Sequence, residues 1–467
     1  MLGRTRRVHF VGVGGIGMSG IAELLANLGY EISGSDAKGS DVTARLQQRF
    51  NVRVFEGHAA GNIGDADVVV VSSAIRKTNP EIVEAERRGI PVIPRAEMLA
   101  ELMRLHFAIA VAGSHGKTTT TSMIALVLER GGLDPTAVIG GRLSVFGSNA
   151  RLGDSEYMVV EADESDRSFL MLWPSIAVVT NVDREHMESY RSLDELQQAF
   201  ADFANKVPFY GSVVACADDS NLMAVLPRMK RRVVTYGLDN PEATIVGRDV
   251  EVGTFGGRCA VHRQSVSGSA FLGRLELSVP GRHNLQNALA AVAAGDQLGL
   301  GFAQVASALR DFAGAERRFE RHGEAAGVLV VDDYGHHPTE IAAVLAAARS
   351  ALNRRLIVAF QPHRYSRTAQ LLDEFGPALK EADEIVLTDI YAASEEPIPG
   401  VTLETLADSI RRGAGRPVHV VRLLDDVVAR LIDICRPGDA IITLGAGSIG
   451  TLPRKLMDAL NRREAGR

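Results

Sequence analysis

The sequence predicts an α/β protein built from three consecutive domains, and three observations support this fold class. The chain has 467 residues, more than one hydrophobic core normally accommodates. Short apolar runs typical of buried strands alternate with segments of helical spacing along most of the chain. Glycine-rich loops follow three of these runs, as they do at the ligand-binding edge of parallel sheets.

Composition narrows the functional class. Hydrophobic residues make up 46% of the chain and charged residues 23%, as in an ordinary soluble globular protein. The formal net charge of −6 argues against nucleic acid as a partner, because phosphate-backbone binding needs a basic excess. No run approaches the ~20 apolar residues of a membrane span, so we expect no membrane insertion. The apolar run at the N-terminus is broken by glycines and leads into a motif, so we expect no signal peptide and a cytoplasmic protein.

The three cysteines, Cys216, Cys259 and Cys435, lie far apart in the sequence and form no CxxC pair. This spacing indicates neither a disulfide framework nor a structural zinc site. We expect each of them to be a small core residue rather than a nucleophile.

The first hundred residues read as a doubly wound, Rossmann-like domain, which we place at residues 1–104. Five short apolar runs predict its strands, at residues 8–13, 30–33, 52–55, 67–71 and 91–93. Residues 18–28 have helical apolar spacing and end at a glycine, which predicts the first helix.

The loop after the first strand, Gly12-Val-Gly-Gly-Ile-Gly17, matches GxGxxG. Glycines there permit a tight turn and close approach of backbone N–H groups to a pyrophosphate, and the following helix adds its dipole. Asp36 ends the second strand, where an acid often binds ribose hydroxyls. On this pattern alone a nicotinamide-dependent dehydrogenase is the leading interpretation, and a turn that binds nothing is the alternative. A second match, Gly445-Ala-Gly-Ser-Ile-Gly450, shows that the pattern indicates a fold before it indicates a ligand.

The central domain, placed at residues 105–314, contains a more specific loop. A strand at residues 108–112 runs into Gly113-Ser-His-Gly-Lys-Thr118 and then a helix over 117–129. Backbone amides from Gly113 to Lys117 can surround a β-phosphate, Lys117 can neutralise the γ-phosphate, and the Thr118 hydroxyl suits Mg²⁺. Since Val111 stands where the full Walker spacing has glycine, this is the shortened P-loop, and it predicts ATP and Mg²⁺.

Further strands are predicted at residues 157–160 and 176–180, and their ends carry candidate metal ligands. We expect Glu161 to bind the metal, whereas Asp163 and Glu164 could form a solvated acidic turn. His186 follows the next strand and could bind a second metal through a neutral imidazole. Residues 244–277 suggest a small antiparallel insertion, and residues 280–287 open an alanine-rich helix.

The third domain, residues 315–467, is predicted to be Rossmann-like, with strands that alternate with helices. Its strands are expected at residues 327–332, 356–360, 384–388, 418–421 and 440–444. His336, His337 and His363 would ordinarily be interpreted as surface histidines.

Several segments together resemble the Mur ligase family of peptidoglycan synthesis. They are GSHGKTTT, EADESD, TNVDREHM, GRHNLQNALAA, DDYGHHPTE and QPHRYSRT. The N-terminal HFVGVGGIGMSGIAELL, with SGSD following, is similar to the branch that adds alanine. The resemblance covers all three predicted domains in order.

The resemblance implies one ligand for each domain. The N-terminal domain would hold the UDP-sugar, UDP-N-acetylmuramate, through Gly14, Gly15, Ile16, Gly17, Asp36, His58, Ser72 and Ser73. The central domain would bind ATP with Mg²⁺ on Thr118, Glu161 and His186. The implied ATP ligands of this domain are Gly113, Ser114, His115, Gly116, Lys117, Thr118, Thr119, Asn284 and Asn287. The two asparagines would contact the adenine. Arg318, from the start of the third domain, would also bind ATP. The C-terminal domain would bind L-alanine through Tyr334, His336, Arg364 and Arg367.

The implied reaction forms an acyl phosphate from ATP and the lactyl carboxylate, with Lys117, Glu161 and His186 as the catalytic set. L-alanine then displaces phosphate. Such a sequence needs a closed state that excludes water. Arg317 and Arg318 form either a solvated hinge or an arm that reaches ATP on closure. Ser114 replaces a frequent threonine, a change that we expect to be neutral, and the sequence offers no candidate for the carbamylated lysine of other branches.

Three alternatives remain open. A sibling ligase would attach a recycled tripeptide to the same UDP-sugar, an oxidoreductase would use the first loop for a nicotinamide cofactor, and a nucleotide-gated scaffold would lack catalysis. We expect a monomer or a weak homodimer.

Overall fold

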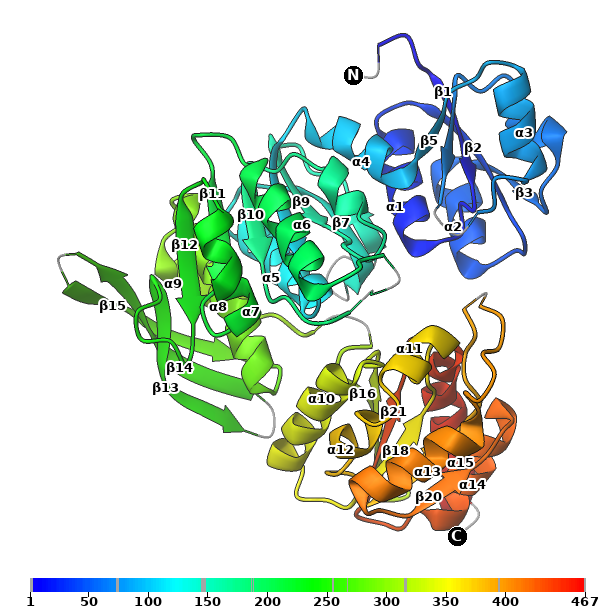
Figure 1. Cartoon of the computed structure of the whole chain (residues 1–467), viewed down its shortest axis with the longest axis vertical. Helices are drawn as coiled ribbons and strands as arrows, with labels where there is room; N and C mark the ends of the chain where they lie inside the picture. Colours follow the sequence, from blue (N-terminus) through cyan, green and yellow to red (C-terminus); the bar gives the residue numbers. More distant parts are fainter. Residues whose placement is uncertain are drawn as a thin grey trace. The chain divides into compact units, whose positions relative to one another are not determined.

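The computed structural model of the chain describes residues 3–72, 75–143, 148–185, 187, 189–253, 256–266, 268–314, 317–393 and 395–465. It contains three sheets, each flanked by helices (Figure 1). The chain divides into two compact units, described separately below. The first holds Met1–Val250, Arg258–Glu276 and Leu285–Ala313, and the second holds Glu251–Gly257, Leu277–Asn284 and Gly314–Arg467.

The N-terminal sheet is parallel, with strand order β3-β2-β1-β4-β5. Its strands are β1 (Arg7–Val11), β2 (Glu31–Asp36), β3 (Arg53–Glu56), β4 (Val68–Val71) and β5 (Val92–Pro94). Its helices are α1 (Ile16–Asn27), α2 (Asp41–Phe50), α3 (Pro80–Arg87) and α4 (Arg95–Met103), with a 3-10 turn η1 (Ala60–Ile63). Because the chain leaves β1 toward β2 and returns to it at β4, the carboxyl end of β1 is the point where such sheets bind ligands.

The central sheet has the order β15-β14-β13-β12-β11-β10-β6-β9-β7-β8. Its strands are β6 (Phe107–Ala112), β7 (Thr136–Leu143), β8 (Ser148–Arg151), β9 (Tyr157–Glu161), β10 (Ile176–Val179), β11 (Ser212–Cys216), β12 (Val233–Gly237), β13 (Ile245–Gly253), β14 (Gly256–Ser265) and β15 (Gly268–Leu277). The accompanying helices are α5 (Lys117–Arg130), η2 (Ser168–Met171), α6 (Leu193–Asn205), α7 (Ser220–Val225), η3 (Leu226–Arg228), α8 (Arg282–Gln297) and α9 (Phe302–Arg310). Strand β6 pairs in parallel with both β9 and β10, so the segments that follow these three strands meet at one edge.

The C-terminal sheet has the order β16-β17-β21-β18-β19-β20, and only its edge pair β16–β17 is antiparallel among the strand pairs of the described residues. Its strands are β16 (Glu320–Ala325), β17 (Val328–Asp333), β18 (Leu356–Phe360), β19 (Glu384–Leu387), β20 (Val418–Val420) and β21 (Ala440–Leu444). Helices α10 (Pro338–Ala351), α12 (Phe375–Ala378) and α13 (Leu403–Ala414) cover one face. Helices α14 (Leu424–Ile434) and α15 (Leu452–Ala465) cover the other, which gives the two-sided layering of a doubly wound domain (Figure 1).

The predicted fold class is confirmed, and the predicted strands form within a few residues of their expected ends. Strands β7, β8, β11, β12 and β16 were not predicted. Strand β16, with the sequence ERHGEA, is polar because it lies at a sheet edge, and such a strand carries no apolar run. The strands of the expected antiparallel insertion, β13 to β15, extend the central sheet beyond β12, with which β13 pairs in parallel. All three cysteines are buried, as expected of core residues, and burial raises the pKa of Cys216 to about 12.

Candidate active site

The first glycine loop, which joins β1 to α1, is held by the end of β2. The Ser35 carbonyl accepts hydrogen bonds from the N–H groups of Gly12 (2.8 Å) and Val13 (3.0 Å). The Asp36 carboxylate accepts one from the Gly14 N–H at 2.8 Å. A Cβ at Gly14 would lie 2.8 Å from that carboxylate, so a larger residue there would require the Asp36 side chain to move. Asp36 is therefore placed at the loop, where it binds a backbone N–H.

The remaining N-terminal candidates are near this loop, with one exception. Ser72 follows β4, and its Cβ lies 4.0 Å from the position of a Cβ at Gly12. His58 follows β3 and lies 3.0 Å from the Ser35 hydroxyl. Gly15 is the N-cap residue of α1, and Ile16 is its first residue. Ser73 lies outside the described residues.

A cation that sequence reasoning missed lies at the same loop. Arg95, the first residue of α4, places its Nη1 2.8 Å from the position of a Cβ at Gly17. Burial would raise the pKa of Asp163, which follows β9, but the charge of Lys117, the hydrogen bonds from Ser165 and, to the smallest extent, the charge of Arg95 hold it below its usual range. Arg95 is thus close to the glycine loop and within electrostatic range of the central sheet. Since 78 residues separate it from Gly17, no local pattern could have predicted this contact.

The second glycine loop, which joins β6 to α5, is fixed by the residues that follow β10. Thr180 Oγ1 donates to the His115 carbonyl (2.6 Å), and the Asn181 amide both accepts from the His115 N–H (2.8 Å) and donates to its carbonyl (3.0 Å). A Cβ at Gly113 would lie 2.0 Å from Thr180 Oγ1, and its φ of +139° also favours glycine. The Ser114 hydroxyl accepts from the Asp183 N–H at 2.8 Å, so its side chain also docks the loop.

Lys117 is the first residue of α5, and its ammonium lies within the loop. It donates to the Gly113 carbonyl (2.6 Å), the Ser114 carbonyl (3.1 Å) and Glu164 Oε1 (2.9 Å). Burial alone would lower the pKa of Lys117, but the charges of Glu164 and Asp163 outweigh it and raise the pKa. Glu164 is 0% exposed, so the solvated turn considered for it is wrong: this carboxylate is the buried partner of Lys117.

Two of the three expected metal ligands are brought together. Thr118 Oγ1 donates to Glu161 Oε1 at 3.2 Å, across a sequence separation of 43 residues. The hydroxyl and the carboxylate are both hard oxygen donors, which is the set that Mg²⁺ prefers. His186 lies outside the described residues.

Other residues predicted to bind ATP lie around the second glycine loop. His115 Nε2 lies 2.9 Å from Asp183 Oδ2. Asn287, on α8, is buried, and its Oδ1 lies 2.7 Å from the position of a Cβ at Gly116, which has φ +81°. Thr119 is buried in the first turn of α5. Asn284, by contrast, uses its amide within the second unit, where it donates to the Pro280 carbonyl at 2.7 Å.

The amino-acid candidates form a cluster within the second unit, beyond the ends of β17 and β18. The rings of Tyr334 and His336 are 5.5 Å apart, and those of His336 and His363 are 5.3 Å apart. Arg367 Nη1 donates to His363 Nδ1 at 3.3 Å, and Arg364 adopts a strained φ of +72° at the start of α11 (Tyr365–Gln370). Burial lowers the pKa of His363 to about 3, helped by His336 and Arg367. His363 is therefore neutral and part of the cluster rather than a surface histidine.

His337 differs from the adjacent His336 because its side chain caps a helix. It is 2% exposed and caps α10, where its Nδ1 accepts from the Thr339 N–H at 3.3 Å. His337 is therefore a helix-capping residue, whereas the His336 ring lies in the cluster with Tyr334 and His363.

The third glycine loop, Gly445 to Gly450, is filled by side chains of its own domain. A Cβ at Gly447 would lie 2.6 Å from the Tyr391 ring, and one at Gly450 would lie 2.5 Å from the Arg317 guanidinium. Arg317 also donates to Asp332 Oδ2 (2.6 Å) and to the Gly445 carbonyl (2.6 Å). The interpretation of Arg317 as part of a solvated hinge is therefore wrong. Arg318 has a looser contact, with Glu340 Oε1 at 3.4 Å.

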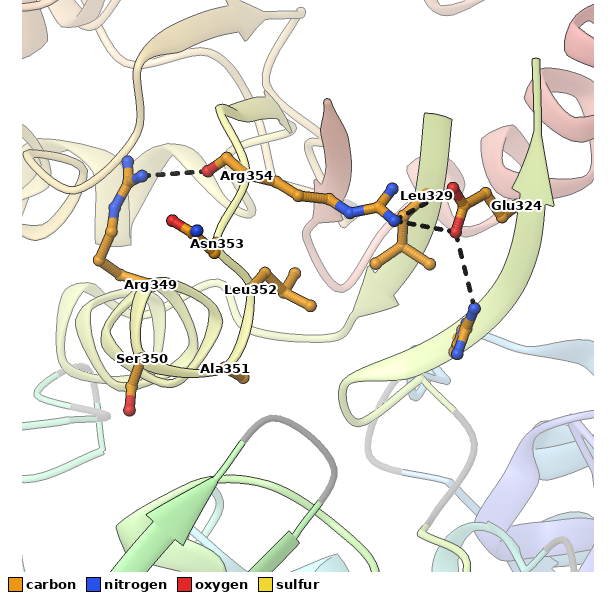
Figure 2. Close-up of a pocket in the computed structure, with 9 residues that line it drawn as sticks. Glu324, Leu329, Arg349, Ser350, Ala351, Leu352, Asn353 and Arg354 are labelled. Atoms are coloured by element: carbon orange, nitrogen blue, oxygen red, sulfur yellow. Dashed lines mark hydrogen bonds and ion pairs between the residues drawn. The ribbon is translucent and has the colours of Figure 1, made fainter. Parts of the chain in front are cut away.

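A separate pocket in the C-terminal sheet lies near the amino ends of β17 and β18, away from these clusters. Figure 2 shows Arg354 extended toward Glu324, which it contacts at 3.0 Å, and Arg349 donating to the Arg354 carbonyl at 3.2 Å. Because the domain's own carboxylates and a carbonyl already engage these arginines, the pocket does not present them to an anionic ligand.

Comparisons with known proteins bear on all three sheets. Three family models match in order: the Mur ligase family catalytic domain at residues 7–107, the Mur ligase middle domain at 111–295 and the Mur ligase glutamate ligase domain at 317–447. The UDP-N-acetylmuramate–L-alanine ligase of Geobacter sp. (strain M21) is 52% identical over 450 residues, which cover 96% of each chain. The chain belongs to the Mur ligase family. The ligase of the same name from Myxococcus xanthus is 54% identical over 97% of this chain and 95% of that protein.

Solved structures agree in fold over the whole chain. The UDP-N-acetylmuramate–alanine ligase of Thermotoga maritima superposes with a TM-score of 0.82 at 30% identity, covering 99% of this chain and all of that one. The murein peptide ligase of Psychrobacter arcticus has a TM-score of 0.73 at 26% identity, covering 98% of this chain and 99% of that one. Among the described residues, no helix has the length and apolar character that a membrane crossing requires.

Proposed function

We propose that this Mur ligase joins L-alanine to the lactyl carboxylate of UDP-N-acetylmuramate, with ATP converted to ADP and phosphate. The observation that carries the proposal is similarity over nearly the whole chain to proteins of that name, at 52% to 54% identity. The pair of glycine loops supports it, because one loop suits a diphosphate and the other a triphosphate. We further propose the domain limits 1–104, 105–314 and 315–467 and a cytoplasmic location.

ATP would bind at the second loop. Helix α5 begins at Lys117 after Gly116, without a side-chain cap among the described residues, so its first N–H groups can donate to phosphate oxygens. Lys117 would exchange its contact with Glu164 for the γ-phosphate, which keeps the ammonium paired in both states. Its raised pKa keeps it charged while two anions approach each other.

Thr118 and Glu161 would hold Mg²⁺, since their oxygens already lie within contact of one another, and His186 is the proposed ligand of a second ion. The metal, when bound, neutralises phosphate charge. The acceptor carboxylate attacks the γ-phosphorus, the bond to ADP breaks, and an acyl phosphate forms. His115, held by Asp183, orients the loop around the phosphates.

The UDP-sugar would place its diphosphate on the loop from Gly14 to Gly17, with Arg95 as an added cation. Alanine would bind in the second unit, where Arg364 and Arg367 offer a fork to its carboxylate, with Tyr334 and His336 beside them. Its neutral amine attacks the acyl carbon, a tetrahedral intermediate forms, and phosphate leaves. Asn284 and Asn287 are proposed for the adenine, and Arg318 for the phosphates.

A phosphate-release assay with UDP-N-acetylmuramate, ATP and Mg²⁺ tests the proposal, using a panel of amino acids. We expect turnover with L-alanine, weaker turnover with glycine and L-serine, and none after chelation of the metal. Turnover only with the tripeptide L-alanyl-γ-D-glutamyl-meso-diaminopimelate would replace the proposal with the sibling ligase. Absorbance changes with NADH and no phosphate release would replace it with an oxidoreductase.

A further inference from the structure

A buried polar cluster lies directly behind the first glycine loop. Its centre is Glu81 on α3, which is 0% exposed and accepts hydrogen bonds from Ser35 Oγ (2.6 Å) and Asn62 Nδ2 (2.6 Å). His58 Nδ1 lies 3.3 Å from the same carboxylate, and the buried His9 on β1 places Nε2 3.9 Å from it. Burial would raise the pKa of Glu81, but the nearby His9 ring and the hydrogen bonds from Ser35 and Asn62 lower it to about 2, so Glu81 is ionised. One carboxylate therefore ties together β1, β2, η1 and the segment after β3.

The proton count of this cluster assigns the tautomer of His58. A serine hydroxyl has one proton, and that of Ser35 goes to Glu81 at 2.6 Å. His58 Nδ1 lies 3.0 Å from the Ser35 oxygen and 3.3 Å from the ionised carboxylate. Both neighbours can only accept, so the proton of a neutral His58 must be on Nδ1. Its Nε2 is then a hydrogen-bond acceptor.

His58 lies where its Nε2 acceptor could contact a bound nucleotide. Ser35 and Asp36, which hold the glycine loop, are also joined to the segment around His58, because the Asp36 carbonyl accepts from the Gly57 N–H at 2.7 Å. The His58 side chain is 22% exposed, whereas Glu81 and His9 are fully buried. Strands β1, β2 and β3 lie side by side in that order, so a nucleotide with its diphosphate on the loop after β1 would extend its nucleoside toward His58.

We propose that Glu81 is a positioning residue that holds His58 with Nδ1–H inward, so that Nε2 accepts a hydrogen bond from the nucleoside of the UDP-sugar. The donor is either the N3–H of uracil or the ribose 2′-hydroxyl. The inference rests on the proposed function, since it assumes that a uridine nucleotide binds at this loop. In the variant Glu81→Gln, the new amide N–H groups would face side chains that already donate hydrogen bonds to position 81. His58 Nδ1–H would then lose its acceptor, so the ring would no longer be held in one orientation.

Steady-state kinetics of Glu81→Gln test the proposal. We expect the KM for UDP-N-acetylmuramate to rise about tenfold, with kcat and the KM values for ATP and L-alanine within about twofold of wild type. Glu84→Gln is the matched control, because Glu84 lies on the same helix and pairs only at the surface with Arg87. We expect no change in that variant. Equal losses for all substrates in Glu81→Gln would overturn the proposal in favour of a purely structural role.

A double-mutant cycle with His58→Ala asks whether Glu81 acts through His58. We expect His58→Ala to raise the same KM about tenfold and Glu81→Gln to add less than twofold in that background. Independent, multiplying effects would overturn the proposal. If Glu81→Gln does not fold, Ser35→Ala takes its place in the same cycle.

Two further measurements use the wild-type protein. Two-bond ¹H–¹⁵N correlation spectra should show His58 as the Nδ1–H tautomer, and the Nε2–H tautomer would overturn the proposal. Inhibition by UDP, CDP and 2′-deoxy-UDP identifies the donor: loss of affinity with CDP indicates uracil N3–H, and loss with 2′-deoxy-UDP indicates the hydroxyl. Equal inhibition by all three would overturn the proposal. Wild-type turnover with L-alanine separates a failure here from a failure of the proposed function.

Discussion

The two glycine loops of the first unit differ in where their charged partners come from. At the loop after β1, both partners are distant in sequence: Asp36 binds the Gly14 N–H, and Arg95 lies against Gly17. At the loop after β6, the cation belongs to the loop itself, and Lys117 is buried against Glu164. A cation supplied by another helix is sufficient to bind an anion. A cation fixed inside the loop can also stabilise the negative charge that develops on a phosphoryl group during its transfer. The two arrangements therefore fit the proposed roles of the loops, binding at the first and phosphoryl transfer at the second.

Removal of Lys117, the cation of the second loop, should have the largest effect on activity. We expect Lys117→Ala to lower ADP release at least about 10³-fold, while calorimetry shows UDP-N-acetylmuramate binding within twofold of wild type. Lys230→Ala, which changes an exposed lysine, is the control. Because the single change leaves Glu164 buried without its ammonium, the pair Lys117→Met with Glu164→Gln checks that the loss is not one of stability. Near-normal ligation by Lys117→Ala would refute the division of roles between the loops.

Crowding of the second loop should give the next largest effect. A Cβ at Gly113 would lie 2.0 Å from Thr180 Oγ1, so Gly113→Ala must displace the loop from the strand end that holds it. We expect ATP affinity to fall about a hundredfold by calorimetry. Gly132→Ala is a control that adds backbone strain without crowding, since Gly132 has φ +79° but a Cβ there would have no atom of the described residues within 4 Å. This variant should lose about 1 kcal/mol of stability and keep its ATP affinity. Similar ATP affinities in the two variants would contradict the docking argument.

Removal of Arg95, the cation beside the first loop, should have a smaller effect on activity. We expect Arg95→Ala to raise the KM for UDP-N-acetylmuramate about tenfold and to change kcat by less than twofold, because the proposed role of this arginine is in binding alone. Arg104→Ala, at the other end of α4, removes the same charge at the surface and should be silent. A loss in kcat that exceeds the change in KM would mean that Arg95 also takes part in the chemistry.

The smallest expected effect is that of alkaline pH. The pKa of Lys117 is raised above its usual 10.5 in the folded protein, so its stabilising contribution is complete below about pH 10.5 and is lost only as pH rises through the folded value. We therefore expect the dissociation constant of ATP to change less than twofold between pH 8 and 10, measured by calorimetry. A progressive weakening over that range, absent in Lys117→Arg, would show that the ammonium titrates early and that its pairing with Glu164 is weaker than the geometry indicates.

The fold was largely predictable because its strands are buried on both faces and therefore read as apolar runs. Strands β18 and β21 begin and end at the predicted residues, whereas the polar edge strand β16 gave no signal. The P-loop was predictable for a related reason, since a strand, a glycine-rich turn and a helix are consecutive in the chain.

The partners of those loops depended on tertiary structure. The rule that strand ends share an edge correctly brought Glu161 to Thr118, but it could not show that Glu164, three residues later, turns inward to Lys117. The direction of a side chain after a strand depends on the turn that follows and on what packs against it. Arg95 and Glu81 lie still further from the loops they support, in helices whose sequences resemble ordinary amphipathic segments.

The three α/β domains, most of their buried strands and the two loops that can bind phosphates could be predicted from the sequence alone, because these features are local in the chain. The tertiary structure was needed to show which charges face those loops, that the third glycine loop is filled by Tyr391 and Arg317, and that His58 Nδ1 lies against Ser35 and Glu81. The physical reason is that hydrogen bonds and ion pairs between distant segments depend on distances of a few tenths of an ångström, which packing fixes and no local pattern encodes.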